Sequence, residues 1–382
     1  MKFIHLGDLH IGKSIGEFSL IEDQKYILDQ IVALAKERSA DAVLISGDVY
    51  DRSLPTEAAV ALLDDFISAL AGSGIPTFII SGNHDSEGRL NYGSRLFAGQ
   101  GIHIASIFDG TVANYTVEDA FGEVGIYLLP FVKASQVRHF FPDETIESYE
   151  DAVRVLIRHA EIDPARRNIL LAHQFVTGES DPDIAGSEGA SVQNVGTIEK
   201  IHWSAFGDFD YVALGHLHSP QRVGADRVRY AGSPLKYSLS EANSSKSVPV
   251  VTLREKGDLD VELVPLRPLR DLRHITGRLE QLLSAVTDPQ DLLYVTLTDE
   301  EPINDAMGIL QQYYPNTVKV DFRNSHTLEL ENYDLAEFSD TKTFDELISD
   351  FYQTMYGQEI PEEELRVMLD VAREAGVFHE AD

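Results

Sequence analysis

The chain contains no cysteine, which excludes disulfide bonds and every metal site built on thiolate ligands. It also lacks any apolar run near the ~20 residues that a membrane-spanning helix needs. Its N-terminus leads directly into candidate site residues at Asp8 and His10, which is not the pattern of a secretory signal peptide. These absences predict a soluble, cytoplasmic protein.

Basic residues are scarce as well. Lys and Arg number 31 against 63 Asp and Glu, so the formal net charge is −32. The excess is uneven, because residues 329–382 hold 16 acidic and 3 basic residues. A surface that binds nucleic acid normally carries a basic patch, so this composition counts against tight DNA binding by the chain alone.

Length and periodicity favour a layered protein of more than one domain. The 382 residues are 43% hydrophobic, which is enough for a substantial core. Short apolar runs alternate with segments of helical periodicity, and this predicts an α/β architecture. Strands are expected at 2–6, 42–46, 77–81, 102–105, 125–129, 168–172 and 211–214. Helices are expected at 20–38, 55–70 (with Pro55 in the first turn) and 149–160.

Side chains that commonly bind metals follow five of the expected strands. They are Asp8 and His10, then Asp48, then Asn83 with His84 and Asp85, then His173, and finally His216 and His218. Ligands in open α/β sheets collect beyond the carboxyl ends of strands. Each motif alone is an ordinary turn or a structural histidine, but five together indicate one shared site.

The donors at these positions are carboxylates, an amide and imidazoles, a set that fits manganese, iron or zinc better than calcium. Without His84 and Asp85 there are seven such side chains. Seven ligands exceed the needs of one ion and suffice for two ions that share a bridging carboxylate. Two metals roughly 3.5–4 Å apart can clamp both the attacking and the leaving oxygen of a phosphoryl displacement. The sequence therefore predicts a two-metal phosphoesterase site.

The same motifs resemble the signature of the calcineurin-like metallophosphoesterases. They are Asp8-x-His10, Gly47-Asp48, Gly82-Asn83-His84-Asp85, His173 and Gly215-His216-x-His218. This resemblance covers residues 1 to about 218 and implies a four-layer α-β-β-α domain. Residues 47–52, 82–86 and 231–234, with the chain length, are similar to the SbcD-like nuclease subunits. Those subunits act with an SbcC-type ATPase on DNA double-strand breaks.

The resemblance also implies roles for individual residues. Asp8, His10, Asp48 and His218 would hold one metal, and Asp48, Asn83, His173 and His216 the other, with Mn2+ as the expected ion. His84 would protonate the leaving oxygen, or alternatively only orient Asp48 or Asp8. Some relatives carry a further histidine where this chain has Asp51, which puts a second imidazole in doubt. Arg52 is a candidate phosphate contact, with a surface salt bridge to Asp51 or Asp85 as the alternative.

Three parts are expected along the chain. Residues 1–266 form the nuclease domain, in which the β patterns at 228–231, 248–253 and 259–266 complete a second sheet. A loop over 177–195 is interpreted as surface, with substrate contact as the alternative. Residues 267–335 form a small α/β capping domain, which helps to orient DNA in the SbcD-like proteins. It should consist of the segment 269–275, strands at 292–297 and 318–323, and helices near 278–286 and 303–313.

The last part, residues 336–382, is an acidic helical segment. Thr343-x-x-Glu346 is a capping box, and the apolar residues from Phe344 to Met355 then share one helical face. Pro361 opens a second amphipathic helix. The two helices could pack on the chain's own core or dock on a partner, and the resemblance favours docking on the ATPase.

Together these features predict a manganese-dependent DNA nuclease subunit for break processing and recombination. It should act as a 3′→5′ exonuclease on duplex ends and as an endonuclease on single strands and hairpins. The expected assembly is a homodimer within a heterotetramer of two nuclease and two ATPase chains. One alternative is a small-molecule phosphodiesterase, which the acidic charge favours and the cap and tail disfavour. Another is an inactive scaffold, which the full ligand set with His84 disfavours.

Overall fold

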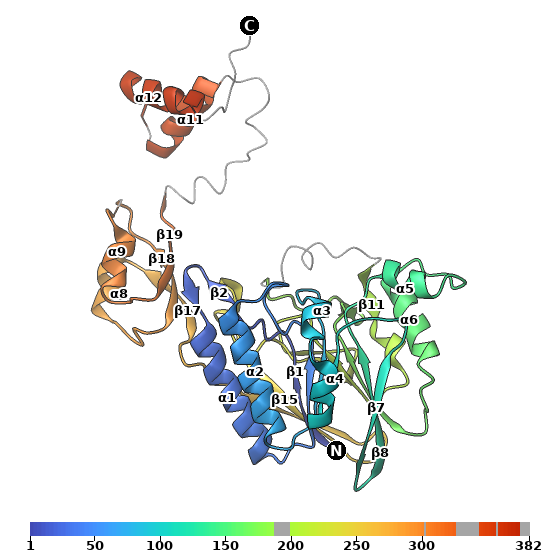
Figure 1. The fold of residues 1–382 in the computed structure, drawn as a ribbon. Helices are drawn as coiled ribbons and strands as arrows, with labels where there is room; N and C mark the ends of the chain where they lie inside the picture. Colours follow the sequence, from blue (N-terminus) through green and yellow to red (C-terminus); the bar gives the residue numbers. More distant parts are fainter. Residues whose placement is uncertain (187–198, 302, 326–343, 357, 375–382) are drawn as a thin grey trace. The chain divides into compact units, whose positions relative to one another are not determined.

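A computed structural model describes residues 1–186, 199–301, 303–325, 344–356 and 358–374 (Figure 1). The chain divides into two compact units. The first is Met1–His274 with Gln290–Leu292, and the second is Ile275–Pro289 with Leu293–Asp382. Among the described residues, no helix combines the length and the apolar character needed to cross a bilayer.

Two six-stranded sheets form the centre of the first unit. One has the order β16–β15–β1–β4–β5–β6, and its strands in that order are Leu259–Pro265, Ser247–Leu253, Lys2–Leu6, Ala42–Ser46, Thr77–Ile80 and Ile102–Ala105. The other has the order β13–β14–β12–β9–β8–β7, with strands Gln221–Val223, Ala225–Tyr230, Tyr211–Leu214, Arg167–Ala172, Gly122–Leu129 and Ala113–Asp119. Each sheet has four consecutive parallel strands, so their carboxyl ends fall at one edge.

Alternating apolar residues explain why the sheets stack. One face of each sheet meets the other sheet, through Phe3, Leu44 and Phe78 on one side and Ile126, Leu171 and Tyr211 on the other. Helices α5 (Ala134–Phe140) and α6 (Tyr149–His159) cover the outer face of the second sheet. Helices α1 (Ile21–Glu37) and α2 (Glu57–Ala71) lie together on the opposite side (Figure 1). The predicted α-β-β-α layering is confirmed.

Some element assignments were wrong. The strands expected at 248–253 and 259–266 do not complete the second sheet, because β15 pairs antiparallel with β1 and extends the first sheet. The strand expected at 125–129 belongs to the second sheet and not the first. Pro55 is not in the first turn of α2, because Thr56 is the N-cap and its hydroxyl accepts a hydrogen bond from Ala59 N.

Several short elements complete the first unit. They are β2 (Ser14–Ile15), β3 (Phe18–Ser19), α3 (Glu87–Leu90), α4 (Ser94–Phe97), β10 (Val176–Thr177) and β11 (Ile201–His202). Much of the loop expected at 177–195 lies outside the described residues, which resume at Glu199.

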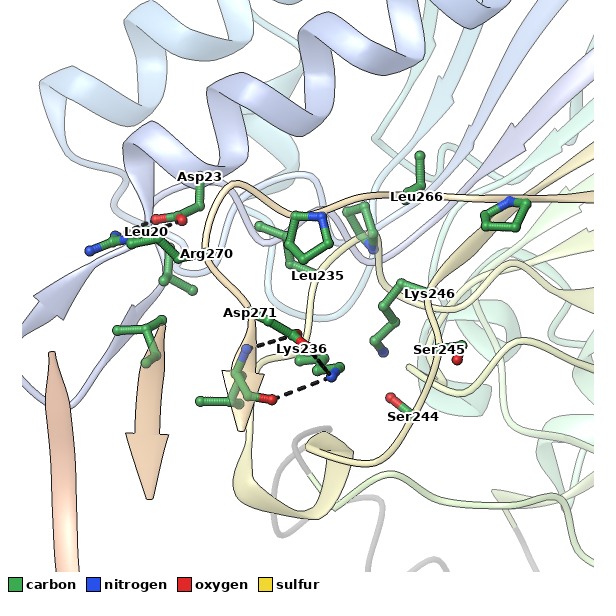
Figure 2. Close-up of a pocket in the computed structure, with 15 residues that line it drawn as sticks. Leu20, Asp23, Leu235, Lys236, Ser244, Ser245, Lys246, Leu266, Arg270 and Asp271 are labelled. Atoms are coloured by element: carbon green, nitrogen blue, oxygen red, sulfur yellow. Dashed lines mark hydrogen bonds and ion pairs between the residues drawn. The ribbon is translucent and has the colours of Figure 1, made fainter. Parts of the chain in front are cut away.

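Ion pairs hold the segment after β16 against the rest of the first unit. They border a pocket of about 270 Å³ (Figure 2). Arg270 Nε donates to Asp23 Oδ1 over 3.0 Å, and Lys236 Nζ lies 2.9 Å from Asp271 Oδ1. Asp23 is nearly fully buried, so its pairing with Arg270 keeps a buried carboxylate satisfied.

The second unit contains most of a three-stranded sheet, β17 (Leu272–Gly277), β18 (Leu292–Leu297) and β19 (Thr317–Phe322). Helices α8 (Leu279–Ser284) and α9 (Ala306–Gln311) accompany it, and Val295, Leu310 and Tyr314 lie in its separate core. Helices α11 (Phe344–Tyr356) and α12 (Glu362–Glu374) follow. The capping-box residue Thr343 lies outside the described residues. The expected domain boundaries, between residues 266 and 267 and between residues 335 and 336, stay predictions.

Candidate metal centre

The seven predicted ligands follow the carboxyl ends of parallel strands from both sheets. Four of them have a backbone that ordinary side chains rarely adopt. The φ angles are 53° at Asp8, 44° at His10, 49° at Asp48 and 102° at His216. Such conformations cost of order 1–3 kcal/mol each and persist where the surroundings impose them. The rest of the fold therefore stabilises these four strained backbone conformations, which direct the side chains toward one another.

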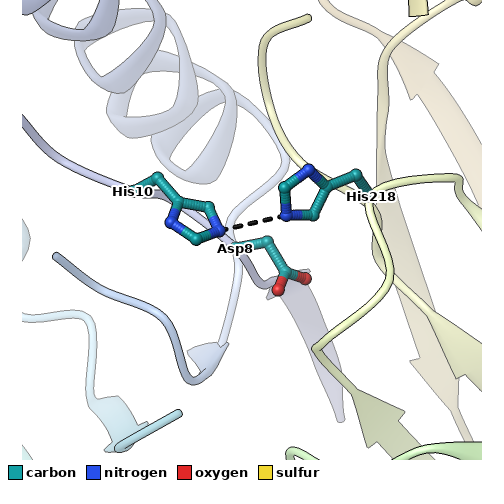
Figure 3. Close-up of side chains that lie close together, drawn as sticks. All are labelled: Asp8, His10 and His218. Atoms are coloured by element: carbon teal, nitrogen blue, oxygen red, sulfur yellow. Dashed lines mark hydrogen bonds between the residues drawn. The ribbon is translucent and has the colours of Figure 1, made fainter. Parts of the chain in front are cut away.

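Asp8, His10 and His218 form one group (Figure 3). Their donor atoms lie within 4.8 Å of one another, and the Nε2 atoms of the two histidines are 3.0 Å apart. Asp8 Oδ1 accepts a hydrogen bond from His216 N over 2.8 Å. The other oxygen, Oδ2, is buried and has no hydrogen-bond partner among the described residues. An orphaned carboxylate oxygen between two imidazoles suits a divalent cation.

Asn83 is the centre of a second group. Its Oδ1 lies 3.1 Å from His173 Nε2 and 2.9 Å from His216 Nδ1. His173 is fixed from behind, because its Nδ1 lies 2.7 Å from the Ser46 carbonyl oxygen and can donate to it. Such a contact sets the tautomer that leaves Nε2 open for a metal.

Asp48 stands between the two groups. Its Oδ2 lies 3.6 Å from His10 Nε2 and 3.4 Å from His173 Nε2. The other oxygen, Oδ1, accepts a hydrogen bond from His84 N over 2.9 Å. Asp48 thus lies between the two groups, at the position that the resemblance gives to the bridging ligand, and Asp8, Asp48 and His173 also have donor atoms within 4.8 Å of one another.

Burial and mutual charge perturb these groups strongly. Burial raises the pKa of Asp8 to about 7 and lowers the pKa of His216 to about 3. Burial also favours the neutral form of Asp48, but His173 outweighs it and holds the Asp48 pKa well below its usual range. Burial likewise disfavours the charged form of His173, but Asp48 outweighs it and raises the His173 pKa. Two buried carboxylates thus depend on nearby positive charge, which a cation supplies without a protonated imidazole.

The loops that carry the ligands are tied together by Asp85. Its carboxylate accepts hydrogen bonds from Gly82 N, Val49 N and Tyr50 N at 2.9–3.1 Å. A side chain at Gly82 would collide with Asp48 Oδ1, so only glycine allows the two loops to approach this closely.

A buried ion pair lies behind His218. Lys246 Nζ pairs with Glu241 and donates to the His218 carbonyl oxygen over 2.9 Å. Glu241 Oε1 is 3.9 Å from His218 Nδ1, and both side chains are 1% exposed. Burial opposes ionisation of Glu241, but His218 and Lys246 outweigh it and lower its pKa to about 2. An ionised carboxylate on the far side of a ligand histidine orients its ring.

The remaining candidates lie at the rim. His84 Nδ1 is 3.1 Å from the Asp51 carbonyl oxygen, and its ring centroid is 4.9 Å from that of His10. Donor atoms of His84, His10 and Asp48 also lie within 4.8 Å of one another. Arg52 points largely into solvent, with Nε 3.5 Å from Asp51 Oδ2. Its phosphate contact stays a prediction.

Sequence reasoning named Asp51 and Asp85 but missed their supporting contacts, and it missed Glu241 and Lys246 altogether. Asp51 Oδ1 lies 3.6 Å from His10 Nδ1 and 2.8 Å from Lys13 Nζ. Its carboxylate therefore lies next to the ring nitrogen of His10 that does not face His218. The contribution of Asp85 was hidden in a motif whose residues are common in turns. Glu241 and Lys246 gave no signal, because nothing in an isolated Glu or Lys indicates burial.

Comparison with known proteins gives consistent results. Residues 1–220 match the family model of the calcineurin-like phosphoesterases, and residues 268–356 match the model described as type 5 capsule protein repressor C-terminal domain. The SbcD subunit of the SbcCD nuclease from Staphylococcus saprophyticus is 34% identical over 371 residues, which cover 94% of each chain.

Among solved structures, a dimetal phosphatase from Danio rerio is similar at a TM-score of 0.41 and 13% identity, over 70% of this chain and 98% of its own. A Thermus thermophilus protein is similar at a TM-score of 0.38 and 12% identity, over 69% of this chain and 98% of its own.

Proposed function

The chain belongs to the calcineurin-like phosphoesterase family and is a nuclease subunit of the SbcD type, and from this premise we propose that it hydrolyses DNA phosphodiester bonds at a two-metal site. The observation that carries the proposal is the position of Asp48 between the two groups of donors. One cation would be held by Asp8, His10, Asp48 and His218, and the other by Asp48, Asn83, His173 and His216. We propose Mn2+ for both, since the donors are hard oxygens and imidazoles.

When bound, the cations supply an activated water and neutralise charge on the phosphate. The chain's own groups do the rest. Asp48 and Asp8 set the negative charge that holds the cations, and the imidazoles of the site fix their positions. His84, when protonated, keeps Nδ1–H on the Asp51 carbonyl oxygen and presents Nε2–H to the leaving oxygen.

The substrates we propose are duplex ends, cut 3′→5′, and single-stranded or hairpin DNA, cut internally. The test is digestion of linear duplex and hairpin DNA with Mn2+, with and without the ATPase partner, beside a bis-phenyl phosphate ester. Cleavage of the ester without any cleavage of DNA would favour the small-molecule phosphodiesterase instead, and no turnover of either would favour an inactive scaffold.

Glu241→Gln should weaken metal binding and also lower the unfolding temperature, because the buried Lys246 ammonium loses its charged partner. The amide keeps the shape but loses the charge that orients His218, and outer contacts of this kind are worth roughly 10- to 100-fold in metal affinity. Calorimetric titration with Mn2+ measures the change. Glu262→Gln, which alters an exposed pair with Arg38, is the matched control and should bind normally. Equal affinity in both variants would contradict this role.

The proposed partner is an SbcC-type ATPase, bound through α11 and α12. Apolar side chains on these helices remain exposed, including Phe351 at 51% and Val371 at 60%. Tyr352 of α11 donates to Glu364 of α12 over 2.9 Å, so the two helices contact each other. An exposed apolar face on a helix pair is a suitable docking surface for a partner helix.

Deleting Thr343–Asp382 should abolish association with the ATPase and leave hydrolysis of a small phosphodiester unchanged. Phe351→Asp should weaken association with the ATPase and leave hydrolysis of the small phosphodiester unchanged, because a charge at an apolar contact is costly to bury. Gln353→Asp, on the same helix and also exposed, is the control. A pull-down in which the truncated chain still binds its partner would refute this assignment.

We also propose that the chain forms a homodimer. The first unit exposes three large apolar side chains, Leu54, Tyr92 and Leu96, at 66%, 85% and 80%, and Tyr92 lines a neighbouring cleft. This cleft has a volume of about 770 Å³ and lies between α2 and the α3–α4 segment. Exposed apolar patches mark interaction sites. Sedimentation velocity of the chain without its partner tests this, and a monomer at micromolar concentration would oppose it.

A further inference from the structure

A second cleft opens directly beside the metal centre. It has a volume of about 370 Å³, and Asn83 and His216 form part of its wall. Ligand pockets span roughly 300–1,000 Å³, so the cleft is large enough for part of a substrate. A phosphate held at the centre would therefore have this cleft next to it.

Aromatic rings form much of the remaining wall. Phe131 follows β8, Phe175 follows β9, and Tyr149 begins α6. The Phe131 ring lies within 24° of parallel to the His216 ring, with centroids 6.4 Å apart. Phe175 is buried, whereas Phe131 and Tyr149 are partly exposed. The cleft thus presents flat apolar faces beside a metal ligand.

The walls are fixed by hydrogen bonds. Phe131 N donates to the Ser81 carbonyl oxygen over 2.9 Å, next to the Asn83 loop. The Gln174 side chain donates to the Val132 carbonyl oxygen over 3.1 Å, and the Tyr230 hydroxyl donates to the Gln174 carbonyl oxygen over 3.0 Å. A cleft that is already formed binds its ligand without an ordering cost.

Charge at the rim of the cleft is mixed, because Lys133 and Glu199 both line it. Lys133 lines the cleft, is exposed, and precedes the first residue of α5. An ammonium here can attract the phosphate of the adjoining nucleotide, which the chain's strongly acidic surface otherwise repels.

We propose that this cleft holds the nucleobase of the nucleotide whose phosphate sits at the metal centre, with Phe131 as the stacking surface. The inference rests on the proposed nuclease function and deepens it. A base inside a duplex is already stacked on both faces, so only an unpaired nucleotide can enter. The site would thus select frayed ends, single strands and hairpin loops. Stacking of a base on an aromatic side chain tolerates any sequence.

The test compares two ligands that differ only in the base. Binding of deoxyadenosine 5′-monophosphate and of 2-deoxyribose 5-phosphate is measured by calorimetry with Mn2+ present. The wild-type chain should prefer the nucleotide. Phe131→Leu should raise the Kd of the nucleotide roughly tenfold and leave the Kd of the sugar phosphate unchanged.

Two further variants are controls. Phe131→Tyr keeps the ring and should retain the preference, and Phe121→Leu removes an exposed ring in the β7–β8 turn and should have no effect. Equal binding of both ligands by the wild-type chain would overturn the inference, as would an equal loss for both ligands in Phe131→Leu. DNA digestion run in parallel separates the two claims. A chain that prefers the nucleotide but cuts no DNA contradicts the proposed function, and not the cleft.

Discussion

Replacing Asp48 with asparagine should remove nearly all phosphodiester hydrolysis and at least one bound cation. The amide keeps the shape and can still accept the hydrogen bond from His84 N. It cannot supply the charge that two cations share. The loss should exceed the roughly 10- to 100-fold effect of residues outside the ligand shell, because Asp48 is proposed to hold both cations. Metal content by mass spectrometry and turnover of a small phosphodiester measure the two effects.

Asp29→Asn is the control for that experiment, since Asp29 is exposed and paired with Lys25 far along α1 from the ligands. In the absence of metal, Asp48→Asn should lower the unfolding temperature only through the lost pairing of Asp48 with His173. A variant with two bound ions and normal turnover would remove Asp48 from the bridging position, and with it the two-metal proposal.

His84→Ala should keep both cations and lose turnover by roughly 10²- to 10⁴-fold, the usual contribution of a positioned general acid. The size of the loss should depend on the leaving group. A nitrophenolate leaves without a proton, so hydrolysis of a nitrophenyl ester should fall much less than hydrolysis of DNA. This comparison separates proton donation from a purely orienting role, which would affect both substrates equally.

The same variant tests a third role, because His84 also lies near enough to His10 and Asp48 to serve as a ligand. Loss of a cation in His84→Ala would assign it to the metal shell. Asp51→Ala is a useful companion, since the contact to His84 uses the backbone carbonyl oxygen and survives the substitution. Its effect should therefore come through His10 and Lys13 and not through His84.

The general outline of the fold could be predicted from sequence because it depends on local periodicity. The strands at Lys2–Leu6, Ala42–Ser46 and Tyr211–Leu214 agree with prediction to the residue. Partner choice could not be predicted, because an alternating pattern marks a strand without saying which strand it pairs with. β15 is the clearest case, because it pairs with β1 of the first sheet and not with any strand of the second.

In the site, too, some residues could be predicted from the sequence and others could not. The spacing Asp8-x-His10 and the run Asn83–Asp85 were sufficient to nominate ligands, since short loops after buried strands place such side chains at one edge of a sheet. The supporting residues were not predictable. Asp51, Glu241 and Lys246 act by being close to a ligand histidine, and that closeness comes from packing across many residues of sequence.

By itself, then, the sequence determined which residues end the strands and what chemistry their side chains can supply. The tertiary structure alone decided which oxygen stands between the two groups, which carboxylate backs each histidine, and that an aromatic cleft adjoins the centre. The physical reason is one of range. Backbone periodicity and turn chemistry act over a few residues, whereas burial and electrostatic coupling depend on every segment that the folded chain brings together.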